Sequence, residues 1–141
     1  ISGIAIAVIN SVNNTDYSKN QNLATSYAQQ ALEVLNVQSK NDWATFSGLS
    51  GSYCLDKNST VLYHPTGDAC LLGGTPNVDN FVREVNITQS NGNCPNCCNG
   101  GKRVQSTVSW ADGKCTDPNN LYCHKVDLFS CITDIHVLPS P

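Results

Sequence analysis

The residues of this sequence best suited to chemistry are its eight cysteines, in a chain of 141 residues without methionine. So many cysteines in a short chain are typical of an oxidising compartment, where thiols pair as disulfides. We therefore expect structural disulfides, each stabilising the fold by about 2 to 4 kcal/mol. Spacing alone leaves their connectivity open, apart from an expected bridge between Cys54 and Cys70 across two early strands. The expected disulfide-forming residues are Cys54, Cys70, Cys94, Cys97, Cys98, Cys115, Cys123 and Cys131.

Two other chemistries are open to the same residues. The segment Cys94-Pro95-Asn96-Cys97 is a C-x-x-C motif, but no βαβ pattern of a redox protein surrounds it and Cys98 follows directly. The second is a zinc site, for which the sequence has ligands of the right type at an irregular spacing. Its ligands would be Cys94, Cys97, Cys115 and either Cys123 or His124. Disulfides are the preferred interpretation, so we expect no metal ion and no cofactor.

Catalytic motifs are absent from the sequence. The histidines His64, His124 and His136 are dispersed, and none is at metal-ligand spacing from another. There is no Gly-x-Ser-x-Gly elbow, no His-Glu-x-x-His pattern and no P-loop. We therefore expect no catalytic residues and no enzymatic activity.

The charge pattern argues against a nucleic-acid partner. Charged residues make up 13% of the sequence and the net charge is -3. Binding to phosphates needs clustered Lys and Arg, whereas Lys102-Arg103 is the only basic pair.

The residues from Ile1 to Val37 are expected to form one long helix. Its start is apolar on nearly all sides, which is typical of a helix surrounded by other apolar groups. A polar collar from Asn13 to Asn22 follows, and residues 23–37 then carry apolar side chains at three- and four-residue steps, the spacing of one helix face. The residues expected to pack on a sheet are Leu23, Tyr27, Ala31 and Leu35.

The apolar first part of this helix, residues 1–12, is expected to serve assembly. The whole helix would be about 55 Å long, so part of it must project from a small domain. A bilayer-spanning helix needs about 20 apolar residues, more than this run holds, so we expect a longer hydrophobic helix to begin upstream of Ile1. Apolar surface that one molecule cannot bury favours head-to-tail association into a helical filament. The expected filament-core residues are Ile1, Ile4, Ala5, Val8, Ile9 and Val12.

The alternative for this segment is a helix buried inside one compact domain. The polar collar argues against it, because such a helix would have to bury the collar as well.

Residues 39–141 are expected to form a globular antiparallel β-domain, so that residues 1–38 are the helical part of the chain. Alternating apolar and polar residues predict strands at Phe81–Gln89 and Arg103–Ala111 and a last strand region within Tyr122–Val137. Shorter strands are expected at 52–56, 60–64 and 69–72. The fold class is therefore α+β, a long N-terminal helix packed on an antiparallel sheet with disulfide-rich loops.

Large aromatic residues follow the helix in a stretch expected to be a loop, and the rings of Trp43, Phe46 and Tyr53 are expected to cap the joint between the helix and the β-domain. A sugar-stacking role for Trp43 is the alternative.

Four segments, in this order along the chain, carry a family resemblance: Asn14–Leu35 after the hydrophobic start, Asn41–Trp43, Phe81–Thr88 and Lys102–Gly113. Together they resemble type IV pilin-like proteins, most closely the minor pilin and pseudopilin branch. The resemblance implies a lollipop shape, with the first half of the helix in the inner membrane before assembly and in the filament core afterwards. The leader-peptidase site and the early glutamate of that family are absent here.

We therefore expect a structural subunit of an extracellular type IV pilus-like filament or pseudopilus at the cell surface, with copies of itself or other pilins as partners. The competing expectation is a secreted disulfide-rich adhesin or carbohydrate-binding module. Its surface or glycan ligand would bind at the loops Ser90–Gly101 and Thr116–Asn120. An extracellular hydrolase ranks third. The helix separates these classes, because a stand-alone binder has no need of the apolar segment Ile1–Ile9.

Overall fold

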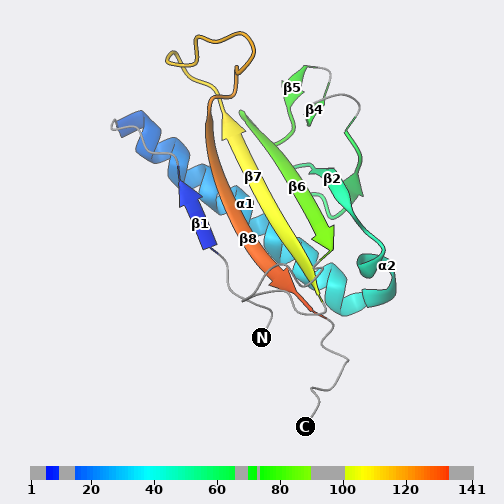
Figure 1. The fold of residues 1–141 in the computed structure, drawn as a ribbon. Helices are drawn as coiled ribbons and strands as arrows, with labels where there is room; N and C mark the ends of the chain where they lie inside the picture. The colour runs from blue at the N-terminus through cyan, green and yellow to red at the C-terminus, as the bar shows by residue number, and fades with distance from the viewer. Residues whose placement is uncertain (1–5, 10–14, 66–69, 73, 90–100, 134–141) are drawn as a thin grey trace.

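The computed structural model describes residues 6–9, 15–65, 70–72, 74–89 and 101–133 of the chain. In this part the protein is an α+β fold in which a long helix lies across one face of an antiparallel sheet (Figure 1). The helices are α1 (Thr15–Asn41) and α2 (Trp43–Ser47). The strands are β1 (Ile6–Ile9), β2 (Gly51–Leu55), β3 (Leu62–Tyr63), β4 (Leu71–Leu72), β5 (Thr75–Pro76), β6 (Phe81–Gln89), β7 (Lys102–Trp110) and β8 (His124–Ile132).

The main sheet has the strand order β1-β8-β7-β6-β2-β3, and all of its neighbouring pairs are antiparallel. A separate two-stranded ladder joins β4 and β5. The centre of the main sheet consists of β6, β7 and β8, each nine residues long. Period-two alternation predicted these three strands, because each has one face toward the core and one toward solvent.

The register decides which side chains face α1. In β7 the even-numbered residues from Lys102 to Trp110 are buried, and the odd-numbered residues between them are partly or fully exposed. Val108 pairs with Arg83 of β6 on one side and with Val126 of β8 on the other, so buried rows continue across the three strands. The opposite side of the sheet, here called the outer face, carries the row Glu84, Thr107 and Asp127.

A narrow stripe of α1 faces the sheet. Ala24, Ala28, Ala31 and Leu35 are fully buried, and Tyr17 extends the same stripe toward the start of the helix. Seven-residue steps such as Tyr17 to Ala24 and Ala28 to Leu35 return almost to the same side of a helix, since seven residues make nearly two turns. The small alanine side chains let the helix backbone lie close to the strands.

The expected sheet contact of Leu23 is wrong, because its side chain is 38% exposed. Ala31 and Leu35 do lie in the contact, and Tyr27 is partly buried against it. The cause is helical geometry. Each four-residue step turns about 40° beyond a full circle, so three such steps from Leu35 back to Leu23 move the side chain by about 120°. Ala24, one position further on, takes the place of Leu23 in the interface.

The prediction of one uninterrupted helix over Ile1–Val37 is also wrong, because Ile6–Ile9 form strand β1, antiparallel to β8. After β8 pairs with β7, the N–H and C=O groups on its other edge still need partners. A segment of the sequence Ile-Ala-Val-Ile suits that edge, since β-branched residues favour strands. In the polar collar, Thr15–Asn22 belong to α1. Residues 1–5 and 10–14 lie outside the described part.

The joint between α1 and the sheet is closed by α2, where the sequence suggested a loop. Asp42 caps this short helix by accepting hydrogen bonds from the backbone N–H and the hydroxyl of Thr45. Phe46 is buried and its ring lies 5.7 Å from that of Trp43. The aromatic pair therefore covers this end of the core.

The bridge between Cys54 and Cys70 is present, with 5.5 Å between the two Cα atoms. It ties β2 to the segment that leads into β4. Both cysteines pack with Val82 in a small second cluster on the outer face.

A matched pair of leucines on α1 tests the assignment of its buried face. We expect Leu35→Ala to lower the free energy of unfolding by about 2 to 5 kcal/mol, because it removes a fully buried side chain. Leu23→Ala should cost less than about 1 kcal/mol. Urea denaturation of both variants measures the difference. Equal losses would contradict the assigned face.

Tyr63 tests the packing of β3 against β2. Burial, together with the hydrogen bond that its hydroxyl donates to Asp56 over 2.7 Å, raises the pKa of Tyr63 to about 12. The unfolded chain ionises this phenol near pH 10, so the contribution of Tyr63 to stability is complete below about pH 10 and is lost as the pH rises toward 12.

We expect the free energy of unfolding to fall less steeply between about pH 9 and pH 11 in Tyr63→Phe than in the unchanged protein. Asp56→Asn, which removes the nearby negative charge, should lower the pKa of Tyr63 in an absorbance titration. An unchanged slope in Tyr63→Phe would show that the phenol is not held as the structure has it.

Candidate functional site

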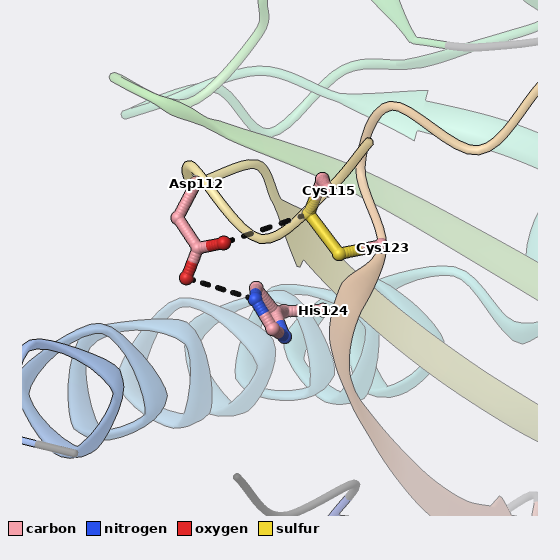
Figure 2. A group of neighbouring side chains, drawn as sticks. All are labelled: Asp112, Cys115, Cys123 and His124. Atoms are coloured by element: carbon pink, nitrogen blue, oxygen red, sulfur yellow. Dashed lines mark hydrogen bonds and ion pairs between the residues drawn. A yellow bond between two sulfur atoms is a disulfide. The ribbon is translucent and has the colours of Figure 1, made fainter. Parts of the chain in front are cut away.

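Four side chains at one end of the sheet form the most concentrated group of potential ligands. Asp112, Cys115, Cys123 and His124, here called the corner cluster, belong to the connection between β7 and β8 (Figure 2). Trp110 and His124 are paired across the last position of β7 and the first of β8, so both ends of the connection are fixed by the sheet. The potential ligand atoms of the cluster all lie within 4.8 Å of one another.

The two cysteines of the cluster are joined as a disulfide, with 5.4 Å between their Cα atoms. It closes a loop with a sequence separation of 8, which stabilises the fold by about 2 to 3 kcal/mol through the entropy of the unfolded chain. Among the described cysteines none is free. Cys131 is disulfide-bonded as well. Cys94, Cys97 and Cys98 lie outside the described residues.

Asp112 is held in place by its own turn. Its carboxylate oxygen Oδ1 accepts a hydrogen bond from the backbone N–H of Lys114 over 2.8 Å, and its backbone oxygen accepts one from the N–H of Cys115 over 3.0 Å. The same Oδ1 lies 3.8 Å from the sulfur of Cys115. The other oxygen, Oδ2, lies 2.9 Å from Nε2 of His124. The Lys114 N–H first, and His124 in addition, hold the pKa of the Asp112 carboxyl below its usual value.

Aromatic packing holds the ring of His124. Its side chain is 7% exposed, and the ring meets that of Tyr17 edge-on at 5.1 Å and that of Trp110 at 5.4 Å. Tyr17 comes from the first turn of α1, so the helix determines the orientation of the imidazole. Nε2 faces Asp112 but forms no well-angled hydrogen bond within the described residues.

The structure brings part of the expected zinc set together and changes its membership. Cys115, Cys123 and His124 are adjacent, whereas Cys94 and Cys97 fall outside the described residues. The carboxylate of Asp112 is a potential ligand that was not expected from the sequence. Its spacing, three residues before Cys115 in a turn rich in Asp and Gly, is the signal that could have indicated it.

A second candidate site is a groove on the outer face, with a volume of about 380 Å³. Side chains of β6 and β7 form its floor, and the loop closed by the Cys115–Cys123 disulfide forms one wall. Glu84 on the floor has no ion-pair partner in the described part of the chain. Its lining residues are Val82, Glu84, Thr107, Ser109, Asn119, Asn120, Leu121 and Tyr122.

The third candidate site is a hollow of about 440 Å³ between α1 and the turn from β2 to β3. The buried Arg83 forms part of its lining. The guanidinium donates hydrogen bonds to the backbone oxygens of Tyr27, Leu55 and Asp56 at distances of 2.8 to 3.0 Å. Asn77 supports it by bonding to the backbone of Arg83 in both directions. Burial lowers the pKa of Arg83 from its usual value, with Asp56 acting in the opposite sense.

Of the six residues expected in the filament core, four are not among the residues that the structure describes. Ile1, Ile4, Ala5 and Val12 lie outside the described residues, and Val8 and Ile9 are part of β1. Neither helix within the described part of the chain is both long and apolar enough to cross a bilayer.

Comparison with protein-family models, with curated proteins and with solved structures finds no match to this chain. The chemistry of the sites must therefore be argued from their own residues.

The hydrogen bonds of Arg83 can be tested with Arg103 as a control. Arg103 lies on the outer face, with its guanidinium 4.4 Å from the centre of the Phe129 ring. We expect Arg83→Met to lower the free energy of unfolding by about 3 kcal/mol or more, since one buried and two partly buried carbonyl groups lose charged donors. Arg103→Met should cost about 1 kcal/mol or less. Urea denaturation measures both. Arg83→Lys, which can serve only some of the carbonyls, should fall between them, and a ranking with Arg103→Met as the more harmful change would refute the network.

Proposed function

We propose that this protein is a structural subunit of an extracellular type IV pilus-like filament or pseudopilus, anchored in the inner membrane before assembly. Its function is to polymerise, with identical copies or other pilins as neighbours and the segment 1–12 as the principal contact. The residues proposed for the filament core are those named from the sequence, Ile1, Ile4, Ala5, Val8, Ile9 and Val12.

The observation that carries this proposal is the position of β1. Among the strands that the structure describes, the segment Ile-Ala-Val-Ile is the outermost of the main sheet and pairs with β8 on one side. An edge strand made entirely of apolar residues is a strong association signal, because natural sheets normally protect their edges with charge, proline or a covering element. The protomer thus has an apolar segment in a strand that pairs, within the described residues, with β8 alone.

The arrangement of α1 supports the same function. The helix uses a stripe of alanine and leucine to pack on the sheet, and its first turn lies at the end of the sheet where β7 and β8 are connected (Figure 1). A helix that is firmly attached along residues 17–39 can transmit load between an assembled N-terminal segment and the β-domain. In the filament, residues 6–9 leave the edge of β8 and extend α1 into a shared helical core, where apolar side chains of many copies are buried together.

The disulfides fit a filament outside the cell. Cys54–Cys70 and Cys115–Cys123 close loops at the surface of a domain with few charges, and such bridges stabilise small domains in oxidising surroundings.

A carbohydrate-binding module or adhesin is the second candidate, and the groove on the outer face is the observation that favours it. The loop Thr116–Asn120, expected to carry such a site, contributes Asn119 and Asn120 to the wall of that groove. Amide, hydroxyl and carboxylate groups beside the ring of Tyr122 are suited to a neutral polar ligand such as a sugar. This activity is compatible with a filament subunit, since the groove lies on the face of the sheet opposite α1.

Assembly is tested by placing a charge in the apolar segment. We expect the full chain to form filaments or large polymers visible by electron microscopy, and Val8→Asp to abolish them, because a carboxylate cannot be buried among apolar helices without a partner. Val61→Asp is the matched control, since Val61 is 66% exposed on the β-domain.

Sedimentation and circular dichroism complete this test. Polymerisation should increase the helical signal as residues 6–9 change from strand to helix. A protein that stays monomeric at high concentration, or a Val8→Asp variant that polymerises like the unchanged chain, would refute the proposal.

A further inference from the structure

We propose that the corner cluster is a zinc site in the dithiol form of the protein, so that a disulfide and a divalent metal ion are alternative ways of closing the connection between β7 and β8. The ligands are the thiolates of Cys115 and Cys123, Nε2 of His124 and the carboxylate of Asp112.

The positions of the four groups carry this inference. Their ligand atoms lie within 4.8 Å of one another, and the ligands of a tetrahedral zinc ion are about 3 to 4 Å apart, given metal–ligand bonds of about 2.0 to 2.3 Å. Two sulfur atoms released from a disulfide must separate to nearly that distance. Rotation of one cysteine by one staggered step about χ1 moves its sulfur by about 3 Å, so the backbone can stay in place.

The histidine provides a second and independent observation. His124 is 5% exposed, and its Nε2 is a buried nitrogen that forms no well-angled hydrogen bond within the described residues. It faces Asp112 (Figure 2). The carboxylate oxygen Oδ2 of Asp112 lies 2.9 Å from this nitrogen without a well-angled hydrogen bond, and a metal ion between the two groups would bind both.

The site is also organised before any ion arrives. The backbone N–H of Lys114 orients Asp112, while Tyr17 and Trp110 enclose the imidazole from the side of α1. Because these contacts do not involve the sulfur atoms, they can persist when the disulfide is opened. The two thiolates are soft ligands and the imidazole is an intermediate one, so the set favours zinc over magnesium or calcium although its fourth member is a hard carboxylate.

The two states exchange by ordinary thiol chemistry. A dithiol reductant transfers two electrons and two protons to the Cys115–Cys123 bond, which breaks to give two thiols, and the reductant becomes a disulfide. Zinc then displaces the two thiol protons as it binds. In either state the loop is closed, so the wall of the groove on the outer face is kept both before and after the chain reaches an oxidising compartment.

The experiment uses the full chain, reduced with an excess of dithiothreitol that is then removed without oxygen, and titrated with Co²⁺ as a spectroscopic probe. We expect absorption bands of thiolate-bound tetrahedral cobalt, which Zn²⁺ bleaches. Cys115→Ser/Cys123→Ser should lose one equivalent of bound metal. The oxidised protein should take up none at this site.

Conservative variants separate this site from the other cysteines of the chain. Asp112→Asn and His124→Gln keep all eight cysteines, and each should weaken binding of that equivalent by at least about ten-fold. Cys94→Ser/Cys97→Ser should leave it unchanged. Circular dichroism of each reduced, metal-free variant identifies a loss of fold.

The proposal is overturned if reduced protein binds no metal, if Cys115→Ser/Cys123→Ser binds as much as the unchanged chain, or if Cys94→Ser/Cys97→Ser removes the equivalent assigned here. It is also overturned if Asp112→Asn and His124→Gln remain folded and bind with unchanged affinity.

Discussion

The burial of one narrow stripe of α1 against β6, β7 and β8 is the constraint on which the other features depend. Three alanines at the centre of the stripe let the helix approach the strands closely, and the larger Tyr17 and Leu35 anchor its ends. At one end Tyr17 meets Trp110 and His124, and at the other α2 folds over Leu35 and its neighbours. The position of the corner cluster therefore follows from how the helix lies on the sheet.

Close packing of this kind leaves backbone oxygens near the core that need donors, and two long cationic side chains supply them. Arg83 serves carbonyl groups of α1, β2 and the residue after β2, so that a single side chain connects three segments. Lys102, which is 3% exposed, donates to the backbone oxygen of Leu49 over 2.9 Å and holds the segment after α2 against the start of β7. Both residues lie at positions that alternate toward the helix, where an apolar residue would leave these oxygens without a partner.

The edge of β8 connects the fold to the proposed function. In the protomer this edge is satisfied by β1, and in the proposed filament the same residues would belong to a bundle of helices. Both arrangements satisfy the backbone groups of this segment, so in the proposed filament the choice between them would depend on whether other copies are present. The corner cluster is similar, because the two cysteines of a disulfide and the two groups beside it would together be the ligands of the proposed zinc site once the sulfur atoms are reduced.

The three long strands and the amphipathic part of α1 could be predicted from the sequence because their signals are local, namely a period of two or near 3.6 residues that one burying surface imposes. The same local rules misplaced Leu23, since an apolar residue at a helical spacing still needs a defined centre for the buried face. They also assigned Ile6–Ile9 to a helix, because apolar character does not reveal that β8 has an open edge.

The sequence by itself determined the class of the fold, the expectation that cysteines form disulfides and the apolar nature of the N-terminal segment. These follow from composition and from residues close together in the chain. Only the tertiary structure decided that Asp112 stands beside His124, that Arg83 reaches three backbone oxygens, and that Asn119 and Asn120 wall a groove over β6 and β7. Each of these depends on distances between residues that the chain brings together from separate elements, and no local pattern contains those distances.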